Sequence, residues 1–495
     1  MSRWLNQLSP LFKFIFLLSL AFLLPFSSCK KDDLLTDSNV ELNFSQKEIL
    51  FDTVFVSIGS TTKNFKVYNP YDQPLKTNIR LAGPGVNFRM NVNGQAGRVF
   101  KDVEIRAKDS LWIFVEVTVD PNAGVLPYII TDSIIFETNG SVQDVDLRAW
   151  GQNAHFIVAD RFLNDNFPLY ALLDTALNAS FTWDSILPYV IYGYLVIDST
   201  QTLTIQAGCK IHFNNGAGLW IYKGGKLNVE GNVNHPVVFQ GIRREASFAE
   251  EPGQWDRIWL NNGSFSNINY AIIKNGFIGL QCDVFPTPAA TDHLFLSNTI
   301  VENMSGFGLL SYNFTIKGWN NVFANCGSYC CALTAGGSYE FLHCTMANYW
   351  KISQRSTPAV YVNNYQSTKT GTDVYNLNSA DFKNCIITGS QDDELKSDFI
   401  TGSGVNINYK FDHCLIKAKD TPTSDINHFN TICRNCDPGF KDTDNNNYEL
   451  GPGSQAIDFG DSAFVIPDTT DFDIKRNLRP STLNTFPDLG AYEKQ

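Results

Sequence analysis

The sequence predicts an all-β protein in which a β-sandwich is followed by stacked coils of parallel strands. Glycine (35 residues) and proline (20 residues) are plentiful, aromatic residues make up 13% of the chain, and amphipathic helical periodicity is scarce. Short alternating segments separated by turn residues fill residues 41–152. A pattern of polar, small and aliphatic residues then recurs over residues 270–416. At 495 residues, the chain is long enough for two or three domains.

The chain carries an excess of acidic residues. Its net charge is −12, and because residues 1–28 hold two basic and no acidic side chains, the remaining chain has a net charge of −14. No segment concentrates lysine and arginine into a basic stripe. Such a body repels the phosphates of DNA and RNA, so the composition argues against nucleic acid as a partner.

Residues 1–28 have the organisation of a signal peptide. A basic start is followed by the apolar stretch Phe14–Leu24, which at 11 residues is too short to span a bilayer, and small residues precede Cys29. The segment resembles the lipobox of bacterial lipoproteins, although Phe26 replaces the usual leucine. The resemblance implies that Cys29 receives a diacylglycerol and becomes the new N-terminus. An ordinary cleaved signal peptide followed by an unrelated cysteine is the alternative.

Residues 29–40 form a polar tether. Lys31, Asp32 and Asp33 resemble the export signal that sends lipoproteins to the outer face of some Gram-negative outer membranes. The resemblance implies an outer-membrane protein that is anchored by its lipid and faces the cell exterior. The alternative is a solvated tether without a signal, because so polar a run cannot fold alone.

Residues 41–152 are predicted to form a β-sandwich. Short alternating strands spaced over about a hundred residues are typical of such domains. The segment resembles the immunoglobulin-like modules often found as stalks on bacterial surface proteins, in architecture only, because the Cys–Trp–Cys signature is absent. Turn residues separate the strands at Asn69-Pro70, Gly83-Pro84-Gly85, Asp120-Pro121-Asn122 and Asn139-Gly140.

Residues 153–195 are expected to be a connector and N-terminal cap, with helical structure around Asn166–Leu177. Residues 196–440 have a different pattern, in which strands alternate with glycine turns. The stretches Leu203–Phe213, Gly225–Gly231 and Pro236–Phe239 resemble the opening coils of right-handed parallel β-helix proteins. The resemblance implies that fold for residues 196–440.

The repeats support the same interpretation. Their starting residues are 22 to 41 positions apart, which fits constant strands with loops of variable length. In stacked coils, equivalent residues lie about 4.8 Å apart and form files along the axis. We therefore expect a file of hydrogen-bonding side chains and, beside it, an interior file of small residues. The repeats begin at Tyr270, Asn298, Asn320, His343, Asn384 and His413.

Residues 441–495 are expected to be a capping segment. Asp437-Pro438-Gly439-Phe440 and the sequence Asp-Leu-Gly-Ala-Tyr-Glu at residues 488–493 resemble the closing signature of secreted β-helix repeat proteins. We expect this segment to block the unpaired backbone of the last coil. The resemblance concerns the fold and implies no activity.

Parallel β-helices are best known as polysaccharide lyases and hydrolases, which use clustered carboxylates. The strands of the repeats are poor in acids, and Glu302, Asp381 and Asp412 are apart in the register. The acidic run at residues 391–394 is interpreted as a solvated loop. The sequence therefore shows no convincing catalytic pair, and whether the chain is an enzyme stays open, with binding favoured.

Aromatic rings beside basic side chains are the best candidates for a ligand site. Trp255 and Arg257 follow an acidic loop, and Trp350, Lys351 and Arg355 lie where a coil closes and a long loop begins. Stacking on such rings could bind sugar. The alternative is that these rings pack against corners of the coils.

A second candidate is a calcium loop. Asp442, Asp444 and Asn446 place oxygen ligands at alternate positions, but the glycine and distal glutamate of an EF-hand are missing. A polar turn is the favoured interpretation. No other cofactor is expected.

Ten cysteines follow Cys29. The lone Cys-x-x-Cys spacing of Cys433 and Cys436 favours a structural disulfide or two buried thiols over a zinc site or redox chemistry. Adjacent Cys330 and Cys331 should not both point inward from a strand, and one of them could pair with Cys326.

The sequence thus favours a non-enzymatic surface lipoprotein that acts as a binding or scaffold module. The partner could be a polysaccharide or an outer-membrane protein complex of which the chain is an accessory subunit. The rival hypothesis is a carbohydrate-active enzyme, a lyase or hydrolase, with its site in a groove of the β-helix.

Overall fold

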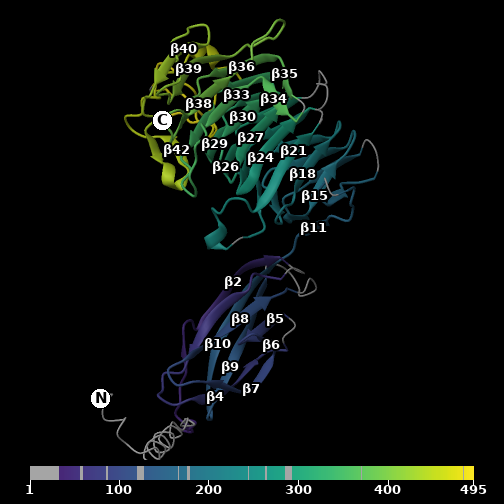
Figure 1. Cartoon of the computed structure of the whole chain (residues 1–495), viewed down its shortest axis with the longest axis vertical. Coiled ribbons are helices and arrows are strands. Elements are labelled where there is room, and N and C mark those ends of the chain that lie inside the picture. The colour runs from purple at the N-terminus through teal and green to yellow at the C-terminus, as the bar shows by residue number, and fades with distance from the viewer. Residues whose placement is uncertain are drawn as a thin grey trace, which may run out of the picture. The chain divides into compact units, whose positions relative to one another are not determined.

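The computed structural model describes residues 33–55, 59–84, 87–119, 128–164, 167–175, 179–243, 245–261, 265–284, 293–369, 371–482 and 484–495. The chain divides into two compact units, Met1–Asn153 and Ala154–Gln495 (Figure 1). Cys29, Lys31 and Asp32 lie outside the described residues, whereas Asp33 is exposed. Among the residues described, no helix is long and apolar enough to cross a membrane.

The first unit is a sandwich of two five-stranded sheets. All its strand pairs are antiparallel except β2 with β10. The first sheet has the order β1 (Asn43–Phe44), β3 (Lys63–Tyr68), β8 (Ser110–Val117), β5 (Phe88–Val92) and β6 (Gln95–Gly97). The second has the order β2 (Glu48–Phe55), β10 (Ser141–Gln152), β9 (Tyr128–Thr138), β4 (Leu75–Leu81) and β7 (Val99–Ile105).

Alternation along the strands builds the core of the sandwich. In β4, Leu75, Thr77, Ile79 and Leu81 are buried and the residues between them are exposed. Successive strand residues point to opposite faces, so one face of each sheet is apolar and the two apolar faces pack together. The predicted sandwich is confirmed.

The second unit is a parallel β-helix, as predicted, and each full coil contributes three strands (Figure 1). One strand of each coil belongs to a nine-stranded parallel sheet. This sheet contains β12 (Tyr170–Leu172), β15 (Tyr194–Ile197), β18 (Gly218–Tyr222), β21 (Trp255–Asn261), β24 (Gly276–Asp283), β27 (Phe307–Tyr312), β30 (Cys331–Thr334), β33 (Val360–Asn363) and β38 (Leu395–Asp398).

The other two strands of each coil form two columns of a continuous 19-stranded sheet. The first column contains β13 (Ser180–Trp183), β16 (Thr202–Gln206), β19 (Lys226–Glu230), β22 (Ser266–Asn269), β25 (His293–Ser297), β28 (Thr315–Trp319), β31 (Gly337–Leu342), β36 (Leu377–Lys383) and β39 (Lys410–Ile416). The second contains β11 (His155–Val158), β14 (Tyr189–Tyr192), β17 (Lys210–Phe213), β20 (Val237–Gly241), β23 (Ala271–Lys274), β26 (Ile300–Met304), β29 (Val322–Cys326), β32 (Thr345–Asn348), β37 (Ile386–Gly389) and β40 (Phe429–Arg434).

The turn between the two columns is built by one left-handed residue per coil. We call these residues the turn file, and their φ angles lie between 47° and 55°. Asparagine tolerates this conformation better than most residues, because its short side chain can hydrogen-bond locally. The register of the flanking strands places the residues of the turn file one above another, which confirms the predicted file. Its members are Tyr270, Asn298, Asn320, His343, Asn384, His413 and Thr431.

The residue after each turn points into the coil. Cys344, Cys385 and Cys414 are fully buried in one interior file, as expected. Thr299 and Asn321 precede them and satisfy backbone groups, since Thr299 Oγ1 donates to Ser297 O at 2.8 Å and Asn321 Nδ2 donates to Leu296 O at 2.7 Å. Small side chains here leave room for the large apolar residues of the strands.

Several expectations about the edges of this unit are wrong. The stretch expected to be helical around Asn166–Leu177 contains β12, which pairs with β15 through Tyr170 and Tyr194. The exposed edge of the first coils provides hydrogen-bond partners that outweigh the local helical preference. Cys330 and Cys331 are both buried, because Cys330 precedes β30 and the strand alternation does not extend to it. Both are free thiols, as is Cys326, whereas Cys433 and Cys436 form a disulfide.

The C-terminal segment is the largest departure from expectation. Instead of blocking the last coil, residues 437–495 lie along the side of the β-helix, where backbone groups of the segment bond to successive coils. Asn320 Nδ2 donates to Phe472 O at 2.9 Å, and Asn384 Nδ2 donates to Asp461 O at 3.0 Å. The segment contains the hairpin of β41 (Phe440–Asp442) and β42 (Asn447–Leu450), and the short helices η3 (Thr443–Asn445) and η4 (Ser462–Phe464).

Hydrophobic burial explains this placement. The outer face of the second column carries apolar residues, among them Val322, Ala347 and Ile386, which the segment covers with Tyr448 and Leu489. The closing signature is the contact point with the coils. A Cβ added to Gly490 would lie 2.5 Å from Thr345 Oγ1, and its φ of +84° also favours glycine.

Two further elements lie outside the columns. The hairpin of β34 (Tyr365–Thr368) and β35 (Gly371–Val374) extends the long loop before β36, and the short helix η2 (Ala246–Phe248) lies in the loop before β21.

Asn384→Ala should lower the free energy of unfolding of the β-helix unit by about 2–4 kcal/mol. The change removes hydrogen bonds to His343 at 3.1 Å and to the Asp461 backbone at 2.9 and 3.0 Å, and it places alanine at a left-handed φ. Asn384→Gly keeps the backbone unstrained, so it should lower the free energy of unfolding less than Asn384→Ala does. Denaturant unfolding of the three proteins measures both effects, and an unchanged Asn384→Ala midpoint would contradict the role given to the turn file.

Candidate functional site

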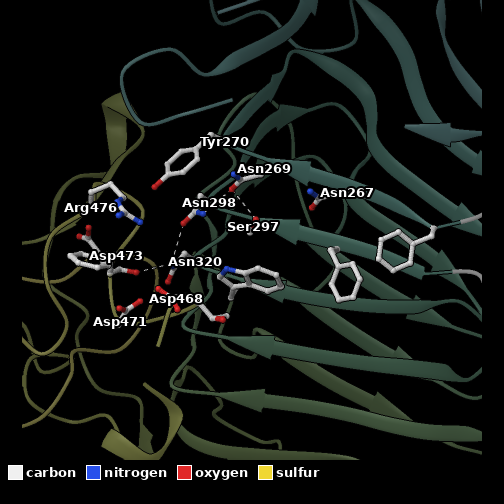
Figure 2. A pocket seen from close by; sticks show the side chains of 15 residues that line it. Asn267, Asn269, Tyr270, Ser297, Asn298, Asn320, Asp468, Asp471, Asp473 and Arg476 are labelled. Carbon is white, nitrogen blue, oxygen red and sulfur yellow. Dashed lines mark hydrogen bonds between the residues drawn. The ribbon is translucent and has the colours of Figure 1, made fainter. Parts of the chain in front are cut away.

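Two pockets flank the C-terminal segment where it lies against the coils. The first, which we call the asparagine pocket, has a volume of about 520 Å³. It lies between the outer face of the first column and residues 468–476 (Figure 2). Its lining comprises Phe265, Asn267, Asn269, Tyr270, Phe295, Ser297, Asn298, Trp319, Asn320, Asp468, Thr469, Asp471, Phe472, Asp473 and Arg476.

Strand register brings the coil side of this pocket together. Asn267 pairs with Phe295 across β22 and β25, and Asn269, Ser297 and Trp319 are register partners across β22, β25 and β28. Residues two apart on a strand face the same side, so these side chains project outward while the alternate leucines and isoleucine fill the core. Adjacent coils therefore present polar and aromatic groups at a spacing of about 4.8 Å.

A ladder of side-chain hydrogen bonds fixes the polar floor of the pocket (Figure 2). Asn269 Oδ1 accepts hydrogen bonds from Ser297 Oγ and Asn298 Nδ2, both at 2.9 Å. Asn298 Oδ1 accepts from Asn320 Nδ2 at 3.1 Å, and Asn320 Oδ1 accepts from Arg479 Nη1 at 2.7 Å. Each amide is therefore held in one orientation by its neighbour.

Aromatic rings form the apolar side of the pocket. The ring centroids of Phe265 and Phe295 are 4.9 Å apart, and those of Phe295 and Trp319 are 6.3 Å apart, both near edge-to-face. Phe265 is 48% exposed. The three rings make a continuous apolar surface beside the amides.

The C-terminal segment forms the opposite wall and gives it an acidic character. Figure 2 shows Asp468, Asp471 and Arg476 near the asparagines of the turn file. The Arg476 guanidinium lies 4.4 Å from the Phe472 ring centroid. Burial is the main cause that raises the pKa of the Tyr270 phenol, so Tyr270 keeps its proton near neutral pH.

The second pocket, which we call the Glu302 pocket, lies on the other side of the C-terminal segment and has a volume of about 530 Å³. It brings together four residues that the sequence analysis placed in two separate sites: Trp350 and Lys351 with Asp444 and Asn446. Its lining comprises Glu250, Ile300, Glu302, Asn303, Asn325, Tyr349, Trp350, Lys351, Ile352, Thr443, Asp444, Asn445 and Asn446.

Contacts between these residues join the coils to the C-terminal segment. Lys351 Nζ forms an ion pair with Asp444, and Asn325 Nδ2 donates a hydrogen bond to Asn446 Oδ1. Trp350 is only 8% exposed, and its Nε1 donates to Ser353 Oγ at 2.9 Å. Trp350 is therefore a fixed wall of the pocket.

Asp442, the third residue of the proposed calcium loop, begins a short helical turn. Its side chain accepts hydrogen bonds from Asp444 N at 3.1 Å, Asn445 N at 3.3 Å and Asn445 Nδ2 at 2.7 Å. These bonds hold the pKa of Asp442 below its usual value. Within the described ranges, no group of three histidine, cysteine, aspartate or glutamate side chains is placed to hold a metal ion.

Trp255 and Arg257 lie away from both pockets. Trp255 is 1% exposed and stacks inside the coil on Phe213 at 4.5 Å. Arg257 lies on the outer side of the nine-stranded sheet, where it forms an ion pair with Asp256 at 2.8 Å and a hydrogen bond to Gln281. Residues two apart on a regular strand share a face, but the alternation of β21 is broken here: Trp255, Ile258 and Leu260 are buried, and Arg257 is not.

Arg355 is a buried structural residue rather than part of an open site. Its guanidinium pairs with Glu394 at 2.6 Å, and both side chains are at most 1% exposed. The same arginine donates to Asn348 O at 2.7 Å, and Glu394 Oε2 accepts from Ala359 N at 2.7 Å. The interpretation of residues 391–394 as a solvated loop is therefore wrong for Glu394, because the pair ties the loop to the preceding coil.

Some lining residues were not singled out by sequence reasoning. Asn269 and Phe295 belong to the coils, and the acidic wall opposite them comes from a distant segment, so their meeting depends on the path of residues 437–495. Glu302 was noted only as an acid apart in the register, and Glu250 only as part of the acidic loop before Trp255. The outward phase of each strand could have indicated Phe295 and Trp319. No local sequence pattern indicates that residues 468–476 lie opposite them.

No protein-family model matches the chain, and no curated protein matches it. Among solved structures, a family 123 glycoside hydrolase from Clostridium perfringens, described in terms of glycolipid glycan hydrolysis, is 9% identical with a TM-score of 0.17. That match covers 22% of this chain and 23% of the hydrolase, so the chain spans about a quarter of its length. The PapD-like domain 7 of human CEP192 is 10% identical with a TM-score of 0.17, over 26% of this chain and 97% of that domain. Both scores are too low to support an argument.

Arg355→Met should lower the free energy of unfolding by about 3–5 kcal/mol, because it leaves the Glu394 carboxylate buried without a cation. Lys419→Met removes the cation from the exposed pair with Asp392 and should change stability little. Thermal or denaturant unfolding compares the two variants. Equal losses would show that the Arg355–Glu394 pair is not buried as described.

Proposed function

We propose that this chain is an outer-membrane lipoprotein that faces the cell exterior and binds a polysaccharide in the asparagine pocket. An immunoglobulin-like stalk would present the β-helix, and a lipid on Cys29 would hold the chain to the membrane. The resemblance of residues 1–33 to a lipoprotein leader supports the anchoring part of the proposal.

The observation that carries the binding proposal is the combination of rings and oriented amides. Sugar rings present apolar C–H faces and hydroxyl edges, which match a surface where Phe265, Phe295 and Trp319 adjoin Asn269 and Asn298. The hydrogen-bonded ladder reduces the entropy lost on binding, because the amides are already held in place.

The acidic charge of the pocket and of the chain limits which polysaccharides can bind. Asp468 and Asp471 face the pocket against a single basic residue, Arg476, and the chain beyond residue 28 has a net charge of −14. An anionic glycan would be repelled, whereas a neutral glycan would not. We therefore propose a neutral polysaccharide as the ligand.

Trp319→Ala should weaken the binding of the chain to the polysaccharide at least tenfold, which corresponds to about 1.4 kcal/mol. Affinity electrophoresis of the detergent-solubilised chain in gels that contain neutral or acidic polysaccharides measures this effect. Trp112→Ala, which removes a 45% exposed aromatic of the sandwich, is the matched control and should bind as the wild type does.

Two outcomes would overturn the binding proposal. In one, Trp319→Ala is retained as strongly as the wild type. In the other, no polysaccharide retards the chain while a stable protein complex co-purifies from solubilised outer membrane, which would favour the role of an accessory subunit.

Cys29→Ser should move the protein from the membrane fraction to the soluble fraction, because the acyl chains, worth about 0.8 kcal/mol for each buried CH₂, would be absent. Fractionation followed by immunoblotting measures the distribution. Ser28→Ala, one residue earlier, should leave the protein in the membrane. Membrane retention of Cys29→Ser would refute lipid anchoring.

A further inference from the structure

Glu302 occupies an unusual position in the Glu302 pocket. It projects outward from β26, directly above its register partner Lys274 of the preceding coil. It is half-buried, lines the pocket, and within the described part of the chain its carboxyl has no hydrogen-bond or ion-pair partner. An acid that lines a pocket without a protein partner is a candidate for contact with a ligand.

A second carboxyl is held beside it. Glu250, from the loop before β21, forms an ion pair with Lys274 at 3.1 Å and accepts a hydrogen bond from Asn303 Nδ2. Lys274 is the register partner of Glu302, and Asn303 is its chain neighbour. Asn446 of the C-terminal segment donates to Glu250 at 3.4 Å. Three side chains from three parts of the chain thus fix Glu250 next to Glu302.

The two carboxyls have different environments. Burial raises the pKa of Glu302 to about 7, the charge of Glu250 acts in the same direction, and the Lys274 ammonium opposes both. Glu302 therefore retains its proton in a large share of molecules near neutral pH. Glu250 differs, because the Lys274 ammonium and the Asn303 amide contact its carboxylate directly. General acid and base catalysis by two carboxyls requires one that donates a proton and one that accepts a proton.

The pocket around the pair suits a saccharide. Its lining combines the apolar side chains of Tyr349, Trp350 and Ile352 with the amides of Asn325 and Asn446 and the Lys351–Asp444 pair. A volume of about 530 Å³ lies within the range of small-ligand sites. The lining holds the acidic residues Glu250, Glu302 and Asp444 against one basic residue, Lys351, so it favours a neutral sugar over an anionic one.

We propose that Glu302 and Glu250 hydrolyse the glycosidic bond of a neutral glycan that enters the Glu302 pocket. Glu302 donates its proton to the glycosidic oxygen as the bond from that oxygen to the anomeric carbon breaks. Glu250 takes a proton from a water molecule whose oxygen bonds to the anomeric carbon. The products are a hemiacetal and an alcohol, and one water molecule is consumed.

After this step Glu302 is ionised and Glu250 is protonated, and exchange with solvent restores both. This activity goes beyond the binding proposed for the asparagine pocket and uses different residues. The two proposals can therefore fail separately.

The test measures release of reducing ends by the full chain from a panel of purified neutral polysaccharides, namely glucans, mannans, xylans and galactans. Glu302→Gln should lower kcat/KM at least a hundredfold, and Glu250→Gln should have a comparable effect. Wild-type activity should fall about tenfold for each pH unit above about 7, since Glu302 loses its proton there.

Glu340→Gln is the matched control. Glu340 also projects outward from a coil, but it pairs with Lys383 at 2.8 Å and lies outside the pocket, so its removal should leave activity unchanged. Thermal unfolding of each variant separates loss of catalysis from loss of fold.

Absence of cleavage across the whole panel would overturn this inference, as would a Glu302→Gln variant that cleaves as fast as the wild type. If a protein that cleaves none of the polysaccharides still binds one of them through Trp319, only the catalytic proposal fails. If Trp319→Ala abolishes retention while cleavage of short oligosaccharides persists, the two sites act independently.

Discussion

The left-handed turn between the two columns of the 19-stranded sheet is the constraint on which the rest of this structure depends. Every coil must turn at the same phase, because backbone hydrogen bonds between parallel strands form only when the strands remain in register. Asparagine and histidine meet this requirement and also link successive coils, as in the contacts from Asn298 to Asn320 and from His343 to Asn384. Variation in loop length is then harmless, since the loops leave the coil elsewhere.

The C-terminal segment turns this regular scaffold into one with sites. Without it, the outer face of the second column would expose apolar residues to water. By covering that face, the segment also brings its own polar side chains next to the coils on both sides. The asparagine pocket and the Glu302 pocket are consequences of this packing. A buried pair of Arg479 and Glu493 at 3.3 Å, joined to Asn320, fixes the segment on the turn file.

The sequence was informative where local chemistry decides the structure. The repeats predicted the turn file and the interior cysteine file, whereas the closing signature was wrongly expected to mark a cap on the last coil. It was less informative about contacts between distant segments. Trp350 and Lys351 were assigned to one site and Asp444 and Asn446 to another, although one pocket contains all four. Arg355 was assigned to a ligand site, but it forms a buried ion pair with the Glu394 carboxylate, 39 residues away.

The amino-acid sequence by itself determined the strand phase, the turns and the stacking of the coils, because these depend on side-chain alternation and on backbone conformations that few residues adopt. Only the tertiary structure decided which outward side chains face a pocket. That outcome depends on the path of residues 437–495 along the coils, which is set by the total apolar surface the segment can cover and not by any short pattern within it.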